Sequence, residues 1–366
     1  MIVLLFFSFI ALLLTSLEQK GSVKNGFGWG MVLVTLIAAI HYNFGSDYWE
    51  YFYSYQDVIR YHYSLRDVLF GELSNKGENG WYLLMFILKP LGVSGFFVLV
   101  ALVAIFQGVV VYKLIKKYVP KQWMVFALYV YLFCISLYVG SMSGIRQHLA
   151  MTIVGCAAPF IVKKKIIPSI IIILVASTIH TSSLIFLPFV LWGYVPLYKT
   201  RYLSIIFIIL YIVFLISASL TEALIGNFIV MDEFEQYETY TGVENKFTYS
   251  FGYVFSMLFP YIITIVYLYN NNSDETKNRL VSLVAAGMTL LPVMASVHLG
   301  IRLLYYFDFI AIVTFPIVFG SIKNKTLRTS LISVYSLYIF YVYYAFFHSE
   351  QRYATTYYYH SLFDLI

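Results

Sequence analysis

Long apolar runs, separated by short polar connections, dominate this chain. A transmembrane helix needs about 17 to 25 predominantly apolar residues to cross the hydrocarbon core of a bilayer. Runs near that length predict spans at residues 2–17, 28–44, 81–115, 122–140, 145–162, 166–179, 182–197, 202–219, 248–269, 280–299, 302–321 and 328–348. The pattern therefore predicts an all-α polytopic membrane protein with about 12 transmembrane helices.

The run at 81–115 is too long for one straight helix, and it contains Pro90, Gly92 and Gly95. Non-helical backbone at membrane depth is tolerated only where protein or a water-filled cavity covers it. We therefore predict a broken or re-entrant segment near 81–95, followed by a single crossing.

Composition supports the membrane class. Of 366 residues, 61% are hydrophobic and only 11% are charged, too few charges to coat a soluble protein of this size. The net charge of +6 is dispersed in short clusters between apolar runs, which argues against a nucleic-acid partner. We expect residues 1–366 to form a single integral membrane domain, in which the opening run is a retained first span.

The charges in the connections predict the orientation. One set of connections holds 16 of the 24 Lys and Arg residues and only three acids; it comprises residues 18–27, 113–121, 163–165, 198–201, 270–279 and 322–328. By the positive-inside rule this set is cytoplasmic, and both termini lie outside. The opposite set includes two long outer loops, 45–80 and 220–247, with six acidic residues each.

Arg146 lies in the first turn of an apolar run, at its predicted outer end. A guanidinium cannot deprotonate to escape the bilayer, so it must meet water, an anion or a carboxylate. We interpret Arg146 as an anion clamp at the membrane surface. The alternative is that its side chain extends to the lipid headgroups, as basic residues near span ends commonly do.

Other polar residues lie near the same predicted outer ends. His180 stands among small hydroxyl residues, where an imidazole can hydrogen-bond between closely packed helices or contact a substrate. His298 and Arg302 are four residues apart and share a helix face, which Tyr305 and Tyr306 continue. Two cationic donors and a phenol suit a pyrophosphate or a sugar. The alternative is that Arg302 is paired with Asp308 or with a loop carboxylate.

Asp47 follows a Gly-Ser turn at the outer end of the second predicted span and leads into an aromatic stretch. An aromatic belt at the membrane interface accounts for those aromatic residues as well as sugar stacking does. It does not account for the carboxylate.

The chain resembles the EpsG-like branch of the Wzy polysaccharide polymerases. The resemblance rests on motifs that occur in family order over residues 45–310: GSDYWEYF, ENGWYLL beginning at Glu78, GIRQHLA with its Arg-Gln pair, IHTSS, and IRLLYYFD. It implies a GT-C-like fold and a glycosyltransferase that polymerises undecaprenyl-pyrophosphate-linked oligosaccharide repeat units into O-antigen, capsular or exopolysaccharide. It also implies multi-pass insertion in the bacterial cytoplasmic (inner) membrane, with the active site facing the periplasm or cell exterior.

That chemistry assigns roles to the residues. Arginines at a low-dielectric site stabilise the charge that develops on a pyrophosphate leaving group, which we assign to Arg146 and Arg302. His180 is expected to position the pyrophosphate or the attacking hydroxyl, and Asp47 to act as general base or to orient that hydroxyl. The expected substrate-binding residues are Glu78, also the second candidate for the base, with Gln147, His298, Tyr305 and Tyr306.

No carboxylate cluster has metal-ligand spacing, so we expect neither a metal nor another cofactor. The expected partners are the lipid-linked oligosaccharide and the bilayer, with a flippase and a chain-length regulator as further partners. A lipid-linked sugar glycosyltransferase or an O-antigen ligase would use the same residues with a different acceptor. A transporter or flippase would instead distribute polar residues along a path through the membrane.

Overall fold

The fold is a bundle of apolar helices, seen in a computed structural model that describes residues 1–61, 63–71, 78–195, 200–217, 251–270, 274–295, 300–348 and 357–365. The helices of the first half are α1 (Ile2–Gln19), α2 (Gly26–Ala39), α3 (Tyr48–Arg60), α4 (Leu65–Phe70), α5 (Asn79–Leu88), η2 (Lys89–Leu91), α6 (Ser94–Tyr118), η3 (Lys121–Trp123), α7 (Met124–Phe133), α8 (Tyr138–Ser143) and α9 (Ile145–Val162). Those that follow are α10 (Ile166–Ile179), η4 (Thr181–Tyr194), α11 (Thr200–Ile216), α13 (Phe251–Tyr269), α14 (Glu275–Thr289), α15 (Leu291–Ala295), α16 (Ile301–Gly320), α17 (Lys325–His348) and η7 (Leu362–Leu365).

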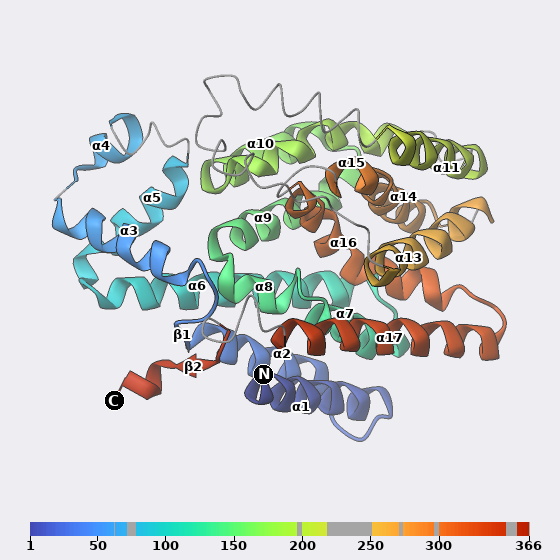
Figure 1. The fold of residues 1–366 in the computed structure, drawn as a ribbon, viewed down its shortest axis with the longest axis horizontal. Helices are drawn as coiled ribbons and strands as arrows, with labels where there is room; N and C mark the ends of the chain where they lie inside the picture. Colours follow the sequence, from blue (N-terminus) through green and yellow to red (C-terminus); the bar gives the residue numbers. More distant parts are fainter. Residues whose placement is uncertain are drawn as a thin grey trace.

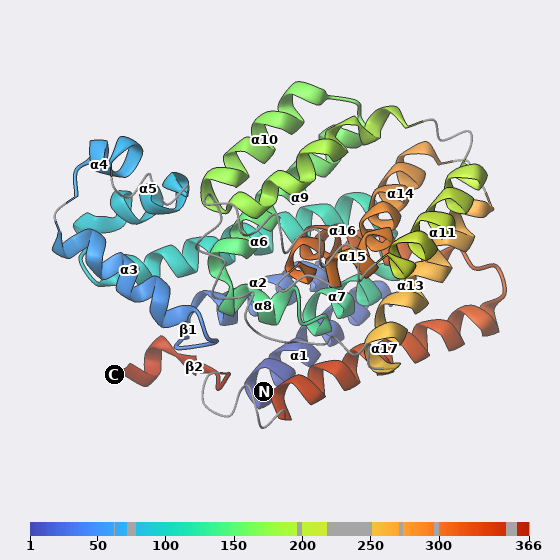
Figure 2. The same ribbon diagram turned by 45° about the horizontal axis from the view of Figure 1, so that its top comes forward.

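The helices form a layered bundle in which α1, α2, α6, α9 and α10 pack in that order (Figure 1). The helix α16 packs against α7, α9 and α14 and connects this layer to the α11, α13 and α14 group. In two views, α3, α4 and α5 project at one end of the bundle, beside the beginning of α6 (Figures 1 and 2).

Within the described residues, five helices, α1, α6, α9, α16 and α17, are long and apolar enough to cross a membrane, and shorter apolar helices accompany them. The predicted all-α membrane class is therefore confirmed. In the described part of the chain, the only strands are β1 (His41–Tyr42) and β2 (His360–Ser361). The count of 12 spans and the GT-C-like fold remain predictions.

Small residues allow the first two helices to pack closely. A Cβ atom added at Gly26 would clash with the backbone oxygen of Leu14, and one at Gly30 would lie 2.8 Å from that of Ala11. Glycine at these positions therefore allows α1 and α2 to form a tight hairpin.

The predicted break in the run at 81–115 is confirmed. The helix α5 ends at Leu88, the short η2 follows, and α6 begins at Ser94. Gly92 has a positive φ of 59°, which a residue with a side chain rarely adopts. The Tyr55 hydroxyl from α3 lies 2.9 and 3.0 Å from the carbonyl oxygens of Leu88 and Gly92, so α3 covers the interrupted backbone.

The prediction of one continuous span at 122–140 is wrong. The helix α7 ends at Phe133, residues 134–137 form a non-helical linker, and α8 begins at Tyr138. The interruption is stabilised by a side chain of α9. The ring of His148 lies 2.9 Å from the carbonyl oxygen of Ser136 in this linker. A hydrogen bond from another helix can replace one that the helix itself would have made.

Two other predicted segments differ in detail. The outer loop 45–80 contains the helices α3 and α4. The span at 280–299 is interrupted, since α14 ends at Thr289 and α15 covers only Leu291–Ala295. The second predicted outer loop, 220–247, lies outside the described residues.

A short antiparallel strand pair connects residues 360–361 to the segment that follows α2. His41 pairs with Ser361 and Tyr42 with His360 in an antiparallel register, and the Leu362 backbone nitrogen donates to the Ile40 oxygen at 2.9 Å. The C-terminal residues therefore lie at the same end of the bundle as the turn that carries Asp47.

Candidate functional site

Glu78 joins the beginnings of α5, α9 and η4. It precedes α5 and is only 7% exposed. Its Oε2 atom lies 2.5 Å from Nη1 of Arg146. Its Oε1 atom accepts a hydrogen bond of 2.5 Å from Nδ1 of His180 and one of 3.4 Å from the backbone nitrogen of Thr181. One buried carboxylate thus holds an arginine and a histidine side by side.

The first turn of α9 sends successive side chains to different elements, because neighbouring helical residues are about 100° apart around the axis. Arg146 meets Glu78, and Gln147 Nε2 donates to the backbone oxygen of Arg302 at 2.9 Å. The buried ring of His148 lies 2.9 Å from the carbonyl oxygens before and after α8. These contacts fix where α9 begins and how Arg146 is presented.

Arg146 keeps donors that Glu78 does not use. Its Nε atom is buried and has no hydrogen-bond partner within the described residues. An unpartnered buried donor is costly, so an acceptor oxygen at this position would be stabilised. The guanidinium also lies over the Tyr51 ring, with its central carbon 5.7 Å from the ring centroid.

His180 stands where α10 ends and η4 begins. Its backbone is extended, with φ −152° and ψ 116°, so the helix is interrupted at the residue that contacts Glu78. Two residues later, the Ser182 hydroxyl lies 2.8 Å from the Tyr306 hydroxyl of α16. Tyr306 is fully buried, so its hydroxyl ties η4 to α16 at the edge of the site.

Asp47 and Tyr51 bring α3 to the site. Asp47 is half-buried, and its Oδ1 accepts a hydrogen bond of 2.6 Å from Ser46. Tyr51 follows one turn later and contacts Arg146. Burial raises the pKa of the Tyr51 phenol, and the negative charge of Asp47 raises it further. The phenol therefore stays protonated. Among the described residues, no Lys, Arg or His side chain forms an ion pair with the Asp47 carboxylate.

Arg302 lies in the first turn of α16 and is exposed, whereas its backbone oxygen accepts a hydrogen bond from Gln147. Within the described chain, its guanidinium has no ion-pair partner. The alternative pairing with Asp308 is not seen, because Asp308 Oδ2 accepts a hydrogen bond of 2.8 Å from the Ser136 hydroxyl instead. No carboxylate of the described residues therefore competes with an anion for Arg302.

Tyr305 and Tyr306, the two tyrosine candidates in α16, have different environments. Tyr305 is half-buried, whereas its neighbour Tyr306 points into the core and is fully buried. Adjacent helical residues cannot share one face, so Tyr306 serves packing more directly than binding. His298 lies outside the described residues.

Sequence reasoning did not single out Tyr51, His148 or Ser182, although each contacts an element of the site. The only signal in the sequence that could have identified them is their short distance along the chain from a predicted site residue. Tyr51 is one turn after Asp47, and His148 and Ser182 each follow a selected residue by two positions. Their contacts were not visible, because these depend on which helices become neighbours.

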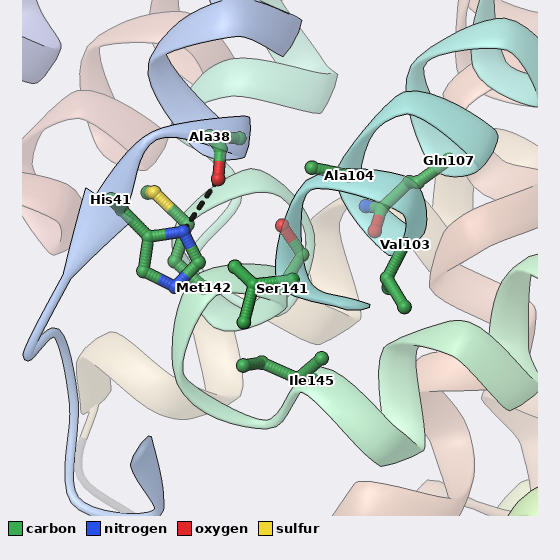
Figure 3. Close-up of a pocket in the computed structure, with 9 residues that line it drawn as sticks. Ala38, His41, Val103, Ala104, Gln107, Ser141, Met142 and Ile145 are labelled. Carbon is green, nitrogen blue, oxygen red and sulfur yellow. Dashed lines mark hydrogen bonds between the residues drawn. The ribbon is translucent and has the colours of Figure 1, made fainter. Parts of the chain in front are cut away.

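A small cavity lies behind the start of α9 (Figure 3). Its lining includes His41, Gln107, Ser141, Met142 and Ile145, and its volume is about 10 Å³. That space holds no more than a single water molecule, so it is too small for a sugar.

In the described part of the chain, no group of three or more His, Cys, Asp or Glu side chains is arranged to hold a metal ion.

The apolar helix bundle and the charged cluster at one end of it define a polytopic membrane protein. A family model described as the EpsG family matches residues 30–361, nearly the whole chain. The chain belongs to the EpsG family, whose members are membrane proteins of the polysaccharide-polymerase type. Comparisons with curated proteins and with solved structures give no match.

Proposed function

We propose that this protein polymerises undecaprenyl-pyrophosphate-linked oligosaccharide repeat units at the outer face of the bacterial cytoplasmic membrane. Membership of the EpsG family supports the class of reaction. The charge bias of the connections, with 16 of 24 basic residues on the opposite side, supports the orientation.

In the proposed reaction, a hydroxyl oxygen at the non-reducing end of one lipid-linked unit bonds to the anomeric carbon of the chain carried by a second lipid. The bond from that carbon to the pyrophosphate oxygen breaks, and its electron pair leaves with undecaprenyl pyrophosphate. The hydroxyl proton passes to a carboxylate, for which Asp47 is the best candidate because it is partly accessible and pairs with no cation among the described residues.

The observation that carries the proposal is that both arginines have hydrogen-bond donors that the described residues do not use. Arg146 is anchored through one nitrogen and retains a buried, unpartnered Nε, and Arg302 is exposed and unpaired within the described residues. Donors that are fixed before the reaction stabilise charge as it develops on the leaving group. Both arginines belong to helices that Gln147 joins directly.

The geometry also refines the role of Glu78. Both of its oxygens are engaged, by Arg146 and by His180, so it is poorly placed to accept a proton from a sugar. We assign it a positioning role, in which it orients the guanidinium and the imidazole. His180 then presents its other ring nitrogen, Nε2, to the substrate.

The test is conversion of the purified lipid-linked repeat unit by the purified protein alone. A ladder of products, each longer by one repeat unit, is expected on gel electrophoresis. Transfer of a single sugar, or transfer to another lipid without a ladder, would instead identify a lipid-linked glycosyltransferase or a ligase.

A further inference from the structure

A partly accessible strip runs along the first two turns of α16. Arg302, Tyr305 and Asp308 follow one another at intervals of three residues, so each is the neighbour of the next on the helix surface, and each is exposed or half-buried. Beyond them, every residue from Phe309 to Phe319 is buried. The strip of partly exposed side chains therefore extends from Arg302 to Asp308, which lies six residues, or about 9 Å, further along the helix axis.

The α7–α8 linker meets this strip at Asp308. Its residues Cys134, Ile135 and Ser136 are half-buried, whereas Phe133 before them and Leu137 after them are buried. The Ser136 hydroxyl donates to Asp308 Oδ2 at 2.8 Å. Two partly accessible segments, from different parts of the chain, thus come together at one carboxylate.

A charged carboxylate within an apolar helix costs desolvation free energy unless hydrogen bonds or an ion pair offset that cost. No ion pair to Asp308 exists in the described chain, and Arg302, on the same strip, leaves it unpaired. A carboxylate offers about four acceptor positions, and Ser136 occupies one. A metal ion would lack ligands, because Asp308 belongs to no group of three or more ligating side chains in the described part of the chain.

We propose that Asp308, oriented by Ser136, accepts hydrogen bonds from sugar hydroxyl groups of the oligosaccharide and forms the inner sugar-binding subsite of the protein. The inference rests on the proposed function. Hydroxyl donors supply the compensation that the carboxylate lacks, through charge-assisted hydrogen bonds. With the pyrophosphate at Arg302, a sugar attached to it extends along the same strip toward Asp308.

The central variant is Asp308→Asn, which keeps an oxygen for the Ser136 hydroxyl but removes the negative charge. A purely structural Asp308 would tolerate this change. A sugar-binding Asp308 would lose affinity by about tenfold or more, the equivalent of one hydrogen bond to a charged group. Ser136→Ala removes only the orienting bond and is expected to weaken binding less. Asp57→Asn, at an exposed carboxylate of α3, is the matched control.

The probe is the free oligosaccharide released by mild acid from lipid-linked repeat units, since it carries neither lipid nor phosphate. Its binding to the purified proteins is measured by tryptophan fluorescence, together with the melting temperature of each variant. Separately, KM and kcat for the lipid-linked unit are measured. We expect Asp308→Asn to melt like the wild type, to bind the probe about tenfold more weakly, and to raise KM more than it lowers kcat.

Equal binding of the probe by wild type and by Asp308→Asn, or no binding by wild type, would overturn the subsite. If Asp308→Asn fails to fold, Ser136→Ala provides the same comparison, and wild-type affinity in that variant would count against the proposal. Probe binding that depends on Asp308 but is not accompanied by a product ladder would refute the polymerase function while retaining the sugar site.

Discussion

Replacing Glu78 by glutamine is expected to loosen the junction of α5, α9 and η4. The carboxylate is 7% exposed and binds both Arg146 and His180. Removing one partner of a buried ion pair costs about 3–5 kcal/mol. Glutamine retains one acceptor oxygen, and the Arg146 side chain is 27% exposed, so water can take over part of the lost interaction. We therefore expect a loss of about 1–3 kcal/mol in the free energy of unfolding, the range for a buried polar group that loses its partner.

The assay is a double-mutant cycle in detergent, with Glu78→Gln, Arg146→Gln and both together, followed by thermal unfolding. If the ion pair supplies the stability, the double variant will be little worse than either single variant, with a coupling of about 1–3 kcal/mol. Asp57→Asn controls for loss of an exposed carboxylate of α3 that forms no ion pair with the other described residues. Unchanged stability in Glu78→Gln, or strict additivity in the double variant, would refute the role assigned to this pair.

Three further predictions concern orientation and chemistry. Arg146→Lys and Arg302→Lys should insert and fold but lose polymer ladders, because lysine lacks the planar fork that gives a phosphate two donors. The expected loss of transition-state stabilisation is about 3 kcal/mol for each variant, and full-length polymer at normal expression would show that both residues are membrane anchors. Asp47→Asn should reduce kcat by about 100- to 10,000-fold while leaving binding of the lipid-linked donor intact, and normal turnover would remove Asp47 from the mechanism. An impermeant thiol reagent applied to intact cells should label a cysteine introduced at Asn75 but not one at Lys164, and the reverse result would invert the topology.

The sequence predicted the class and the helical pattern because apolar run length is a direct consequence of bilayer thickness. It also predicted the break near Pro90, since proline and glycine change the local backbone wherever they occur. The interruption after Phe133 was not predictable in this way. Residues 134–137 look much like the helical sequence on either side of them, and the bond that supports the linker comes from His148 in another helix.

In the candidate site, too, some features could be predicted from the sequence and others could not. Arg146, His180 and Glu78 could each be selected from the sequence, because a polar group near the end of an apolar run must be accounted for. Their partnership could not be, since the Glu78 to His180 contact joins residues 102 positions apart. Hydropathy locates the apolar segments of the chain, but it does not show which of the helices become neighbours. Asp308 was considered only as a partner for Arg302, and the structure gives it a different partner in Ser136.

The first turn of α9 explains how a bundle of apolar helices can hold a precise polar site. Three consecutive residues, Arg146, Gln147 and His148, leave the helix in different directions and reach α5, α16 and the α7–α8 linker. None of these contacts depends on the hydrophobic effect, which does not discriminate between helices once they are in lipid. Directional bonds made by one helix start can therefore select its neighbours. Because Gln147 holds the backbone of Arg302 while Arg146 is held by Glu78, a shift in any one of these helices would disturb the presentation of both arginines.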